Sequence, residues 1–237
     1  MSTKKGFRFK KFDIDHSRST MKVGTDGVLI GAWTTVESPT RVLDIGTGSG
    51  LIAIMLAQRS PEHSHIDAVE ISERDATQAR LNVDSSPWPQ KVSIHHCTIQ
   101  GFHAPQKYQL IVTNPPYFNR SLHPPDQNRL QARHTTSLTY EDIIDAVLRL
   151  MESSGIFSII LPPTEGELFV DLASKHNLHL VRKCVFRTRE EKKPERWMME
   201  FRTTPALVEE ESLTLYLHGE VWTDAYKALT RDFYLNA

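Results

Sequence analysis

The stretch Val42-Leu43-Asp44-Ile45-Gly46-Thr47-Gly48-Ser49-Gly50 decides the fold of this chain. Residues 41–45 form a short apolar strand. The glycines at 46, 48 and 50 permit backbone angles and a close ligand approach that a Cβ atom would block. The apolar run 51–57 then predicts a buried helix whose N-terminus faces the ligand. The stretch therefore predicts a strand, a tight turn and a helix that hold a small ligand.

The glycine spacing and a downstream acid indicate which kind of ligand this is. Gly-x-Gly-x-Gly departs from the Gly-x-Gly-x-x-Gly fingerprint of NAD sites, because position 51 is Leu. Glu70 ends the next strand, where an acid can accept both ribose hydroxyls of a nucleoside. Asp44 lies where the first strand meets the loop, within reach of an amino group. The alternative for both carboxylates is an exposed residue at a strand end.

A second motif, Asn114-Pro115-Pro116-Tyr117, follows the apolar run 110–112. An amine conjugated to a ring is a poor nucleophile, and an Asn oxygen and a backbone carbonyl can accept its two N–H hydrogens. Prolines hold that carbonyl rigid and add no competing N–H donor. Tyr117 offers a flat face for a base. The alternative is a proline turn that ends a strand. Together with the glycine motif, these residues predict methyl transfer from S-adenosylmethionine (SAM) to a planar amine.

The rest of the chain alternates strands and helices, which predicts an α/β fold with helices on both faces of a mostly parallel sheet. The expected strands are 41–45, 65–69, 91–95, 110–113, 155–161 and 178–186, with one or two more within 197–203 and 212–218. Capping-box patterns predict helix starts at Ser72-x-x-Asp75, Thr139-x-x-Asp142 and Thr164-x-x-Glu167. Strands without intervening helices after about residue 190 favour an antiparallel strand at one edge.

At this point the chain resembles the Class I SAM-dependent methyltransferases of the Asn-Pro-Pro-Tyr group. More narrowly, it resembles the bacterial enzymes that N6-methylate the adenosine just 3′ of the anticodon in a valine tRNA. The resemblance covers nearly the whole chain. The segments that carry it, besides the two motifs, are 7–10, 21–27, 132–136, 226–230 and 233–235.

The resemblance implies a Rossmann-like sheet of seven strands and one domain over residues 1–237, with residues 1–38 as an extension that covers the SAM pocket. It implies that SAM is bound by Lys22, Val23, Gly24, Thr25, Asp26, Asp44, Gly46, Thr47, Gly48, Gly50, Glu70, Ile71, Thr98, Ile99 and Asn114. We expect Thr25 to cap a helix over 26–33. Thr98 stands where many relatives place an acid that contacts the adenine of SAM, and it carries no charge. Asn114, Pro115, Pro116 and Tyr117 are the expected catalytic residues.

Two basic clusters are candidates for contacts with tRNA. The first lies within residues 4–12, where Phe7, Phe9 and Phe12 alternate with lysines and an arginine, and the second runs from 182 to 196. Aromatic rings between cations can stack bases while the cations meet phosphates. A basic tail and a solvated loop would look the same. The expected substrate-binding residues are Tyr117, Lys10, Lys11, Arg133, Lys192 and Lys193.

Composition limits the remaining functional classes. The 237 residues have a net charge of −1, so a nucleic-acid site must be a local patch. Two cysteines give no disulfide framework, and no histidine group has metal-ligand spacing. No signal peptide and no membrane-spanning run is apparent. We therefore expect a cytoplasmic monomer without metal.

Other targets and another class of function stay open at this stage. Asn-Pro-Pro-Tyr enzymes also methylate protein glutamine, DNA adenine and rRNA guanine. The glutamine enzymes usually add an N-terminal helical domain, for which there is no room before residue 41, and the DNA enzymes usually add a large recognition domain. A module that binds SAM or RNA without catalysis is the rival from a different class, and the intact motif at Asn114 favours catalysis over it.

Overall fold

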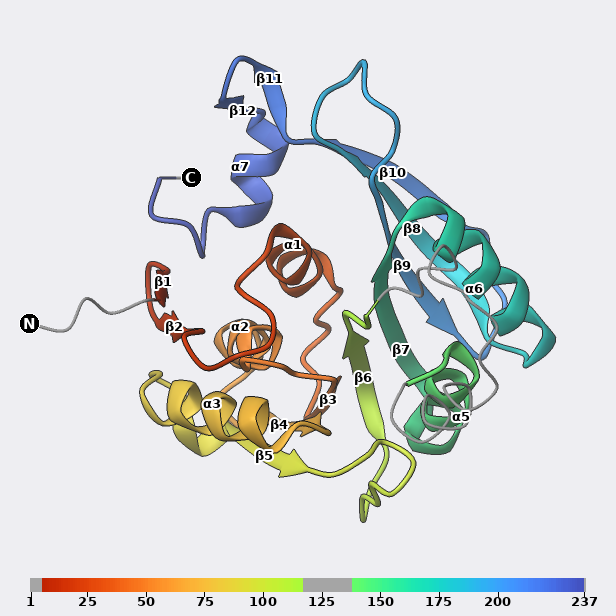
Figure 1. The fold of residues 1–237 in the computed structure, drawn as a ribbon. Coiled ribbons are helices and arrows are strands. Elements are labelled where there is room, and N and C mark those ends of the chain that lie inside the picture. Colours follow the sequence, from red (N-terminus) through yellow and green to blue (C-terminus); the bar gives the residue numbers. More distant parts are fainter. Residues whose placement is uncertain (1–5, 117–137, 237) are drawn as a thin grey trace, which may run out of the picture.

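A computed structural model describes residues 6–116 and 138–236. Within these residues the centre is an eight-stranded sheet with the order β10-β8-β9-β7-β6-β3-β4-β5 (Figure 1). Its strands are β3 (Arg41–Ile45), β4 (His65–Glu70), β5 (Val92–His96), β6 (Tyr108–Thr113), β7 (Met151–Leu161), β8 (His179–Arg187), β9 (Arg196–Arg202) and β10 (Glu209–Thr214). The expected strand positions are confirmed to within a few residues, and the α/β class is confirmed with them.

The sheet differs from the expected one in strand count and in the place of its antiparallel strand. The strand β9 is antiparallel to both β7 and β8, so it lies inside the sheet. The edge is β10, which pairs in parallel with β8. Its sequence begins Glu209-Glu210-Glu211, which lacks the apolar alternation of a strand. Ion pairs with the neighbouring strand explain the pairing: Lys183 lies 2.8 Å from Glu210, and Arg182 lies 2.7 Å from Glu211.

Helices cover both faces of this sheet, and each face has its own hydrophobic core. The helices are α1 (Thr25–Trp33), α2 (Leu51–Arg59), α3 (Glu73–Asp84), α5 (Tyr140–Leu150), α6 (Pro163–Lys175) and α7 (Asp224–Thr230), with a 3₁₀ turn η1 (Pro89–Lys91). Val42 packs with α1 and α2 on one face, and Leu43 packs with α5 and α6 on the other. Successive side chains of a strand point to opposite faces, so β3 serves both cores.

The N-terminal ends of four helices can be compared with the capping residues predicted from the sequence. Thr139 and Asp142 form the complete capping box at α5. At α3, the Ser72 side chain accepts from the Asp75 backbone N–H. The third prediction is wrong, because α6 begins at Pro163, and proline needs no hydrogen-bond partner for its nitrogen at a helix start. The Thr25 cap is also wrong, since Thr25 is already inside α1 and Gly24 occupies the capping position.

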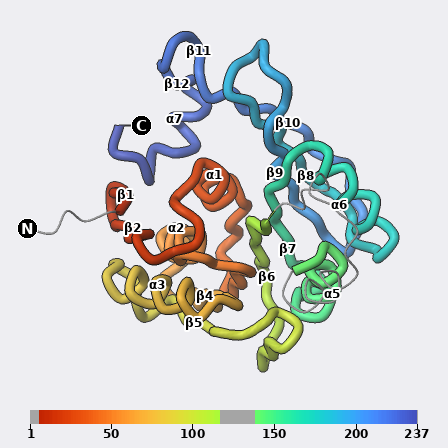
Figure 2. Tube along the Cα trace, in the orientation of Figure 1, coloured from red at the N-terminus to blue at the C-terminus, as the bar shows by residue number. Residues whose placement is uncertain are grey.

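The two ends of the described chain lie side by side. A hairpin of β1 (Gly6–Arg8) and β2 (Asp13–Asp15) meets the segment after α7 (Figure 2), where the Lys10 backbone N–H donates to the Phe233 carbonyl at 2.8 Å. A second small hairpin pairs β11 (Tyr216–His218) with β12 (Val221–Trp222). These segments add a lobe beside α1 that the central sheet does not contain.

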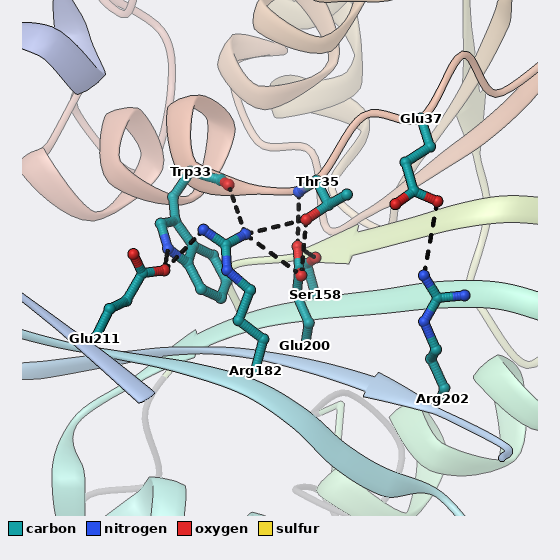
Figure 3. A network of polar contacts seen from close by, with 8 residues as sticks. All are labelled: Trp33, Thr35, Glu37, Ser158, Arg182, Glu200, Arg202 and Glu211. Atoms are coloured by element: carbon teal, nitrogen blue, oxygen red, sulfur yellow. Dashed lines mark hydrogen bonds and ion pairs between the residues drawn. The ribbon is translucent and has the colours of Figure 1, made fainter. Parts of the chain in front are cut away.

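A buried polar network fixes the C-terminal end of α1 to the sheet (Figure 3). The Glu200 side chain is 3% exposed and accepts from the Thr35 backbone N–H at 2.6 Å and the Thr35 hydroxyl at 2.9 Å. The Arg182 guanidinium lies 4.2 Å over the Trp33 ring and contacts Glu200 at 3.5 Å. Because α1 is held at its C-terminal end, its N-terminal end has a defined position above the sheet.

Candidate active site

The glycine loop between β3 and α2 presents open backbone at the carboxyl edge of the sheet. Gly46, Gly48 and Gly50 have φ values of +72°, +55° and +84°, which disfavour a side chain at these positions. No atom lies within 4 Å of where a Cβ would stand on Gly46 or Gly48. The Val69 carbonyl accepts from the N–H groups of Gly46 at 2.9 Å and Thr47 at 3.1 Å. The loop is therefore fixed to β4 and open to a ligand.

Asp44 is a fully buried carboxylate beneath this loop. Its Oδ2 accepts from the Thr47 hydroxyl at 2.6 Å, and its Oδ1 has no hydrogen-bond partner among the described residues. Burial raises the pKa of Asp44 to about 7, with the Thr47 hydroxyl opposing the rise. The nearby Ala53 amide also lowers this pKa, although it does not complete a hydrogen bond to the carboxylate. A ligand's cationic amino group would satisfy Oδ1 and stabilise the charged form.

Glu70, at the end of β4, is 8% exposed and holds the loop from the other side. Its Oε2 accepts from the Gly48 N–H at 2.9 Å, and its Oε1 accepts from the Ser72 N–H at 2.8 Å. A carboxylate has about four lone-pair sites, so hydroxyl groups of a ligand can still be accepted. Ile71, the next residue, is 51% exposed and offers an apolar surface beside the carboxylate.

The end of β5 lies next to Glu70, where the Cys97 N–H donates to the Glu70 carbonyl at 3.1 Å. Thr98 is exposed, and its hydroxyl accepts from the Gly101 N–H at 3.1 Å. Ile99 is 4% exposed and belongs to the core. The structure thus brings Thr98 to the same edge as Glu70, while the Ile99 side chain packs away from solvent.

Asn114 follows β6 directly and stands next to the glycine loop. Ile45 pairs with Thr113 in register, and the Thr113 hydroxyl donates to the Ile45 carbonyl at 2.8 Å. The residues that follow these two are Gly46 and Asn114, so both leave the sheet side by side. Asn114 is half-buried, Pro115 is buried and Pro116 is exposed. Tyr117 and Arg133 lie outside the described residues.

The N-terminal end of α1 lies beside the glycine loop at the carboxyl edge of the sheet. Lys22, Gly24 and Thr25 are exposed, and Val23 is half-buried with its N–H 3.3 Å from His16 Nδ1. Asp26 Oδ2 accepts from Arg196 Nε at 2.8 Å. At the next residue, a Cβ on Gly27 would stand 3.0 Å from Leu51, the first residue of α2. The predicted segment 22–26 therefore adjoins the glycine loop.

Two polar residues of α3 that were not predicted as site residues tie the N-terminal segment to this edge. Asp75 accepts from the Thr20 N–H at 2.7 Å and the Thr20 hydroxyl at 2.6 Å. The Asn82 amide donates to the carbonyls of Asp15 and Ser49, both at 2.8 Å. Asp75 and Asn82 are seven positions apart and share the buried face of α3, but the sequence shows no sign of that burial, because polar residues at this spacing are equally common on exposed faces.

The basic clusters are less available than the sequence predicted. Phe9 and Phe12 are 1% and 5% exposed and pack together at 4.6 Å between ring centroids, so their predicted role in stacking bases is wrong. The Lys10 side chain donates to the Arg231 carbonyl. Lys11, Lys192 and Lys193 are exposed. Of the first cluster, the cations and the half-buried Phe7 therefore stay compatible with the prediction.

Comparison with known proteins agrees with this geometry. Residues 16–160 match the family model of the methyltransferase small domain. A tRNA1(Val) (adenine(37)-N6)-methyltransferase of Bacteroides thetaiotaomicron is 41% identical over 97% of both chains, and one of Aliivibrio fischeri is 40% identical over 98% of both. In fold, the chain is similar to a predicted O-methyltransferase of Agrobacterium tumefaciens, with TM-score 0.68, 16% identity, and coverage of 88% of this chain and 96% of that one.

The unsatisfied Asp44 Oδ1 and the open backbone at Gly46 and Gly48 fit the amino acid part of SAM. No group of three or more potential metal ligands occurs within residues 6–116 and 138–236. In the same part of the chain, no helix combines the length and the apolar character needed to cross a membrane. The protein is a SAM-dependent methyltransferase, and it belongs to the family of the tRNA1(Val) (adenine(37)-N6)-methyltransferases.

Proposed function

We propose that this enzyme methylates N6 of adenosine 37 of tRNA1(Val), the target in the names of its relatives. The observation that carries the proposal is the position of Asn114 directly beside the Gly46 turn, across the paired residues Ile45 and Thr113. A side chain that can accept a hydrogen bond from the substrate amine thus stands next to the loop that fits SAM. Near full-length similarity to tRNA enzymes supports RNA over DNA or protein as the substrate.

The cofactor side of the site consists of carboxylates and bare backbone. When bound, SAM supplies a methyl group activated by its sulfonium. Asp44 would accept a hydrogen bond from its amino group through Oδ1, Glu70 would accept from its ribose hydroxyls, and the backbone of Gly46 and Gly48 would hold the amino acid part. Ile71 and Thr98 would hold the adenine. The other residues in this role are Lys22, Val23, Gly24, Thr25, Asp26, Thr47, Gly50 and Ile99.

On the substrate side, residues 114–117 orient the amine. The Asn114 side-chain oxygen and the Pro115 carbonyl accept the two N6 hydrogens, which turns the nitrogen lone pair toward the methyl group. Pro116 keeps the backbone rigid, and the base stacks on Tyr117. The nitrogen–carbon bond forms as the carbon–sulfur bond breaks, and the amine then releases a proton. Alignment of the two reacting atoms supplies most of the rate.

Residues 1–38 act as an extension over the SAM pocket within one catalytic domain, which the links from Asn82 to Asp15 and Ser49 support. Lys10, Lys11, Arg133, Lys192 and Lys193 contribute phosphate contacts to the tRNA. Lys10 contacts a phosphate while its side chain also donates to the Arg231 carbonyl. We expect a cytoplasmic monomer that needs no metal.

The test gives the purified enzyme and labelled SAM to unmodified valine tRNA, duplex DNA and a glutamine-containing protein domain. Label on N6 of adenosine 37, located by nucleoside mass spectrometry, is the expected result. Label in DNA or protein alone contradicts the RNA substrate. Label on a guanine of the tRNA keeps the RNA substrate and contradicts the base.

A further inference from the structure

An aromatic cavity lies between the N-terminal hairpin and the C-terminal lobe. Its volume is about 330 Å³, at the lower end of the roughly 300–1,000 Å³ usual for small-ligand sites. The rings of Trp222 and Tyr234 lie 5.4 Å apart, and Phe7 lies 5.8 Å from Tyr234. These three residues are half-buried, in contrast to the buried Phe9 and Phe12. Their rings are therefore partly accessible from the cavity.

This cavity extends to the N-terminal end of α1, where Thr25 lines it. A second cavity of about 270 Å³ shares Thr25 and Leu215 with the first, so the two adjoin. Asp26 and Arg196 line the second cavity and pair across it at 2.8 Å. One residue beyond Asp26, Gly27 is packed against the start of α2. Both cavities therefore lie beside the N-terminal end of α1, the end that packs against the start of α2.

Cations lie beside the aromatic rings of this cavity. The Arg8 side chain is 80% exposed and lines the aromatic cavity. The Arg189 guanidinium lies 5.2 Å over the ring of Tyr216, another lining residue. Single-stranded nucleic acid is bound in this way, with bases stacked on aromatic side chains and phosphates against cations. A nucleotide uses both features, because its base stacks on a ring while its phosphate meets a cation, whereas an apolar peptide would use the rings alone.

We propose that the aromatic cavity binds one unpaired nucleotide that neighbours the target adenosine in the substrate RNA. Its base stacks in the cavity against Trp222 and Tyr234, and its phosphate meets Arg8. The target base meanwhile lies at Asn114. This inference rests on the proposed RNA substrate and adds a second recognition site to it.

The test uses an anticodon stem-loop in which 2-aminopurine replaces one nucleotide at a time on either side of the target. Stacking quenches this fluorophore, so binding to the unaltered enzyme should quench it at one flanking position. Trp222→Leu should abolish that quenching and weaken RNA binding about 5- to 150-fold, the range for loss of one base–aromatic stack. Trp88→Leu, another half-buried tryptophan that lines neither cavity, is the matched control.

Arg8→Ala provides a second variant that cannot disturb the core, because its side chain is largely in solvent. It should reduce the dependence of log affinity on log salt by about 0.7, as one phosphate contact does. Lys175→Ala, at the end of α6 on the other face of the sheet, should leave this slope unchanged. Unquenched fluorescence at every flanking position, or RNA binding by Trp222→Leu equal to that of Trp88→Leu, overturns the inference. If the unaltered enzyme binds and methylates the tRNA in that case, the proposed function still stands.

Discussion

The SAM edge, formed by the carboxyl ends of β3, β4 and β6 and by the loop between β3 and α2, contrasts with the far edge, the side of the molecule formed by β8, β10 and the lobe of β11, β12 and α7. Each part of the SAM edge is a short local segment, and backbone groups make many of its contacts, as Glu70 shows by accepting from the Gly48 and Ser72 N–H groups. The far edge is assembled from separate segments through side chains, such as the pairs Arg182–Glu211 and Lys183–Glu210.

The difference teaches where each function resides. In the proposed binding mode, a cofactor common to many enzymes is held by a local loop whose shape depends on three glycines with positive φ. Selection of a substrate requires a surface of its own, and here the N-terminal hairpin, α1 and the C-terminal lobe make the two adjoining cavities. Substitutions in the two regions should therefore alter different measurable quantities.

Asn114→Ala, at the SAM edge, should give the largest effect. We expect the single-turnover rate to fall about 10²- to 10³-fold, as on loss of one group that acts in the transition state. SAM affinity should stay nearly unchanged, because Asp44 and Glu70 are intact. Rapid-quench methyl transfer and calorimetric titration measure the two quantities separately. A variant that turns over at the rate of the unaltered enzyme would refute the amine-binding role of Asn114.

Asp44→Asn removes the charge of the side chain beneath the glycine loop and keeps its size, so it tests whether SAM affinity depends on that charge. A hydrogen bond to a charged group contributes about 1.5–3 kcal/mol, so SAM should bind roughly 10- to 150-fold more weakly at about pH 8. In the unaltered enzyme, whose Asp44 has a pKa of about 7, SAM affinity should fall as pH drops below this value. The variant should lack that dependence. Equal pH profiles of the two proteins in calorimetry would contradict the assignment.

The same residue makes a prediction for the ligand-free protein. The pKa of Asp44 is raised from 3.8 to about 7 on folding, so the protonated form is favoured in the folded state. Stability from this group is present below about pH 4 and is lost as pH rises to about 7. Relative to the unaltered protein, Asp44→Asn should gain stability over that interval in denaturant titrations. A difference that does not vary with pH would show that burial does not perturb Asp44.

The sequence predicted the regions where a short segment determines its own structure. The strand 41–45, the glycine turn and the capping box at Thr139 were all correct, because their geometry depends on adjacent residues. A strand was expected within 212–218, but its parallel pairing with β8 at the edge of the sheet was not, because that pairing depends on Lys183, 27 positions before Glu210. Phe9 was assigned to a surface cluster, because nothing near it in sequence reveals Tyr234 as its partner at 6.0 Å.

Asn82→Ala tests whether the N-terminal segment is held to the SAM edge through α3. The change leaves the Asp15 N–H and the carbonyls of Asp15 and Ser49 without their partner, at a cost of about 1–3 kcal/mol. Hydrogen exchange should increase in residues 13–23 and SAM affinity should fall. Arg80→Ala, on the exposed side of the same helix, is the control. Faster exchange in α3 alone would mean that Asn82 stabilises only its own helix.

The smallest expected effect is the coupling between Lys183 and Glu210 at the far edge. Their side chains are 16% and 63% exposed, and pairs that solvent reaches contribute about 0.2–1 kcal/mol. Lys183→Ala should cost more than Glu210→Ala, because the Lys183 ammonium also lies 4.8 Å over the Trp197 ring. A double-mutant cycle in urea gives the coupling energy, and salt at about 1 M should reduce it because the pair is screened. SAM affinity should be the same in all four proteins. A change in SAM affinity would contradict the separation of the two edges, since this pair touches only the far one.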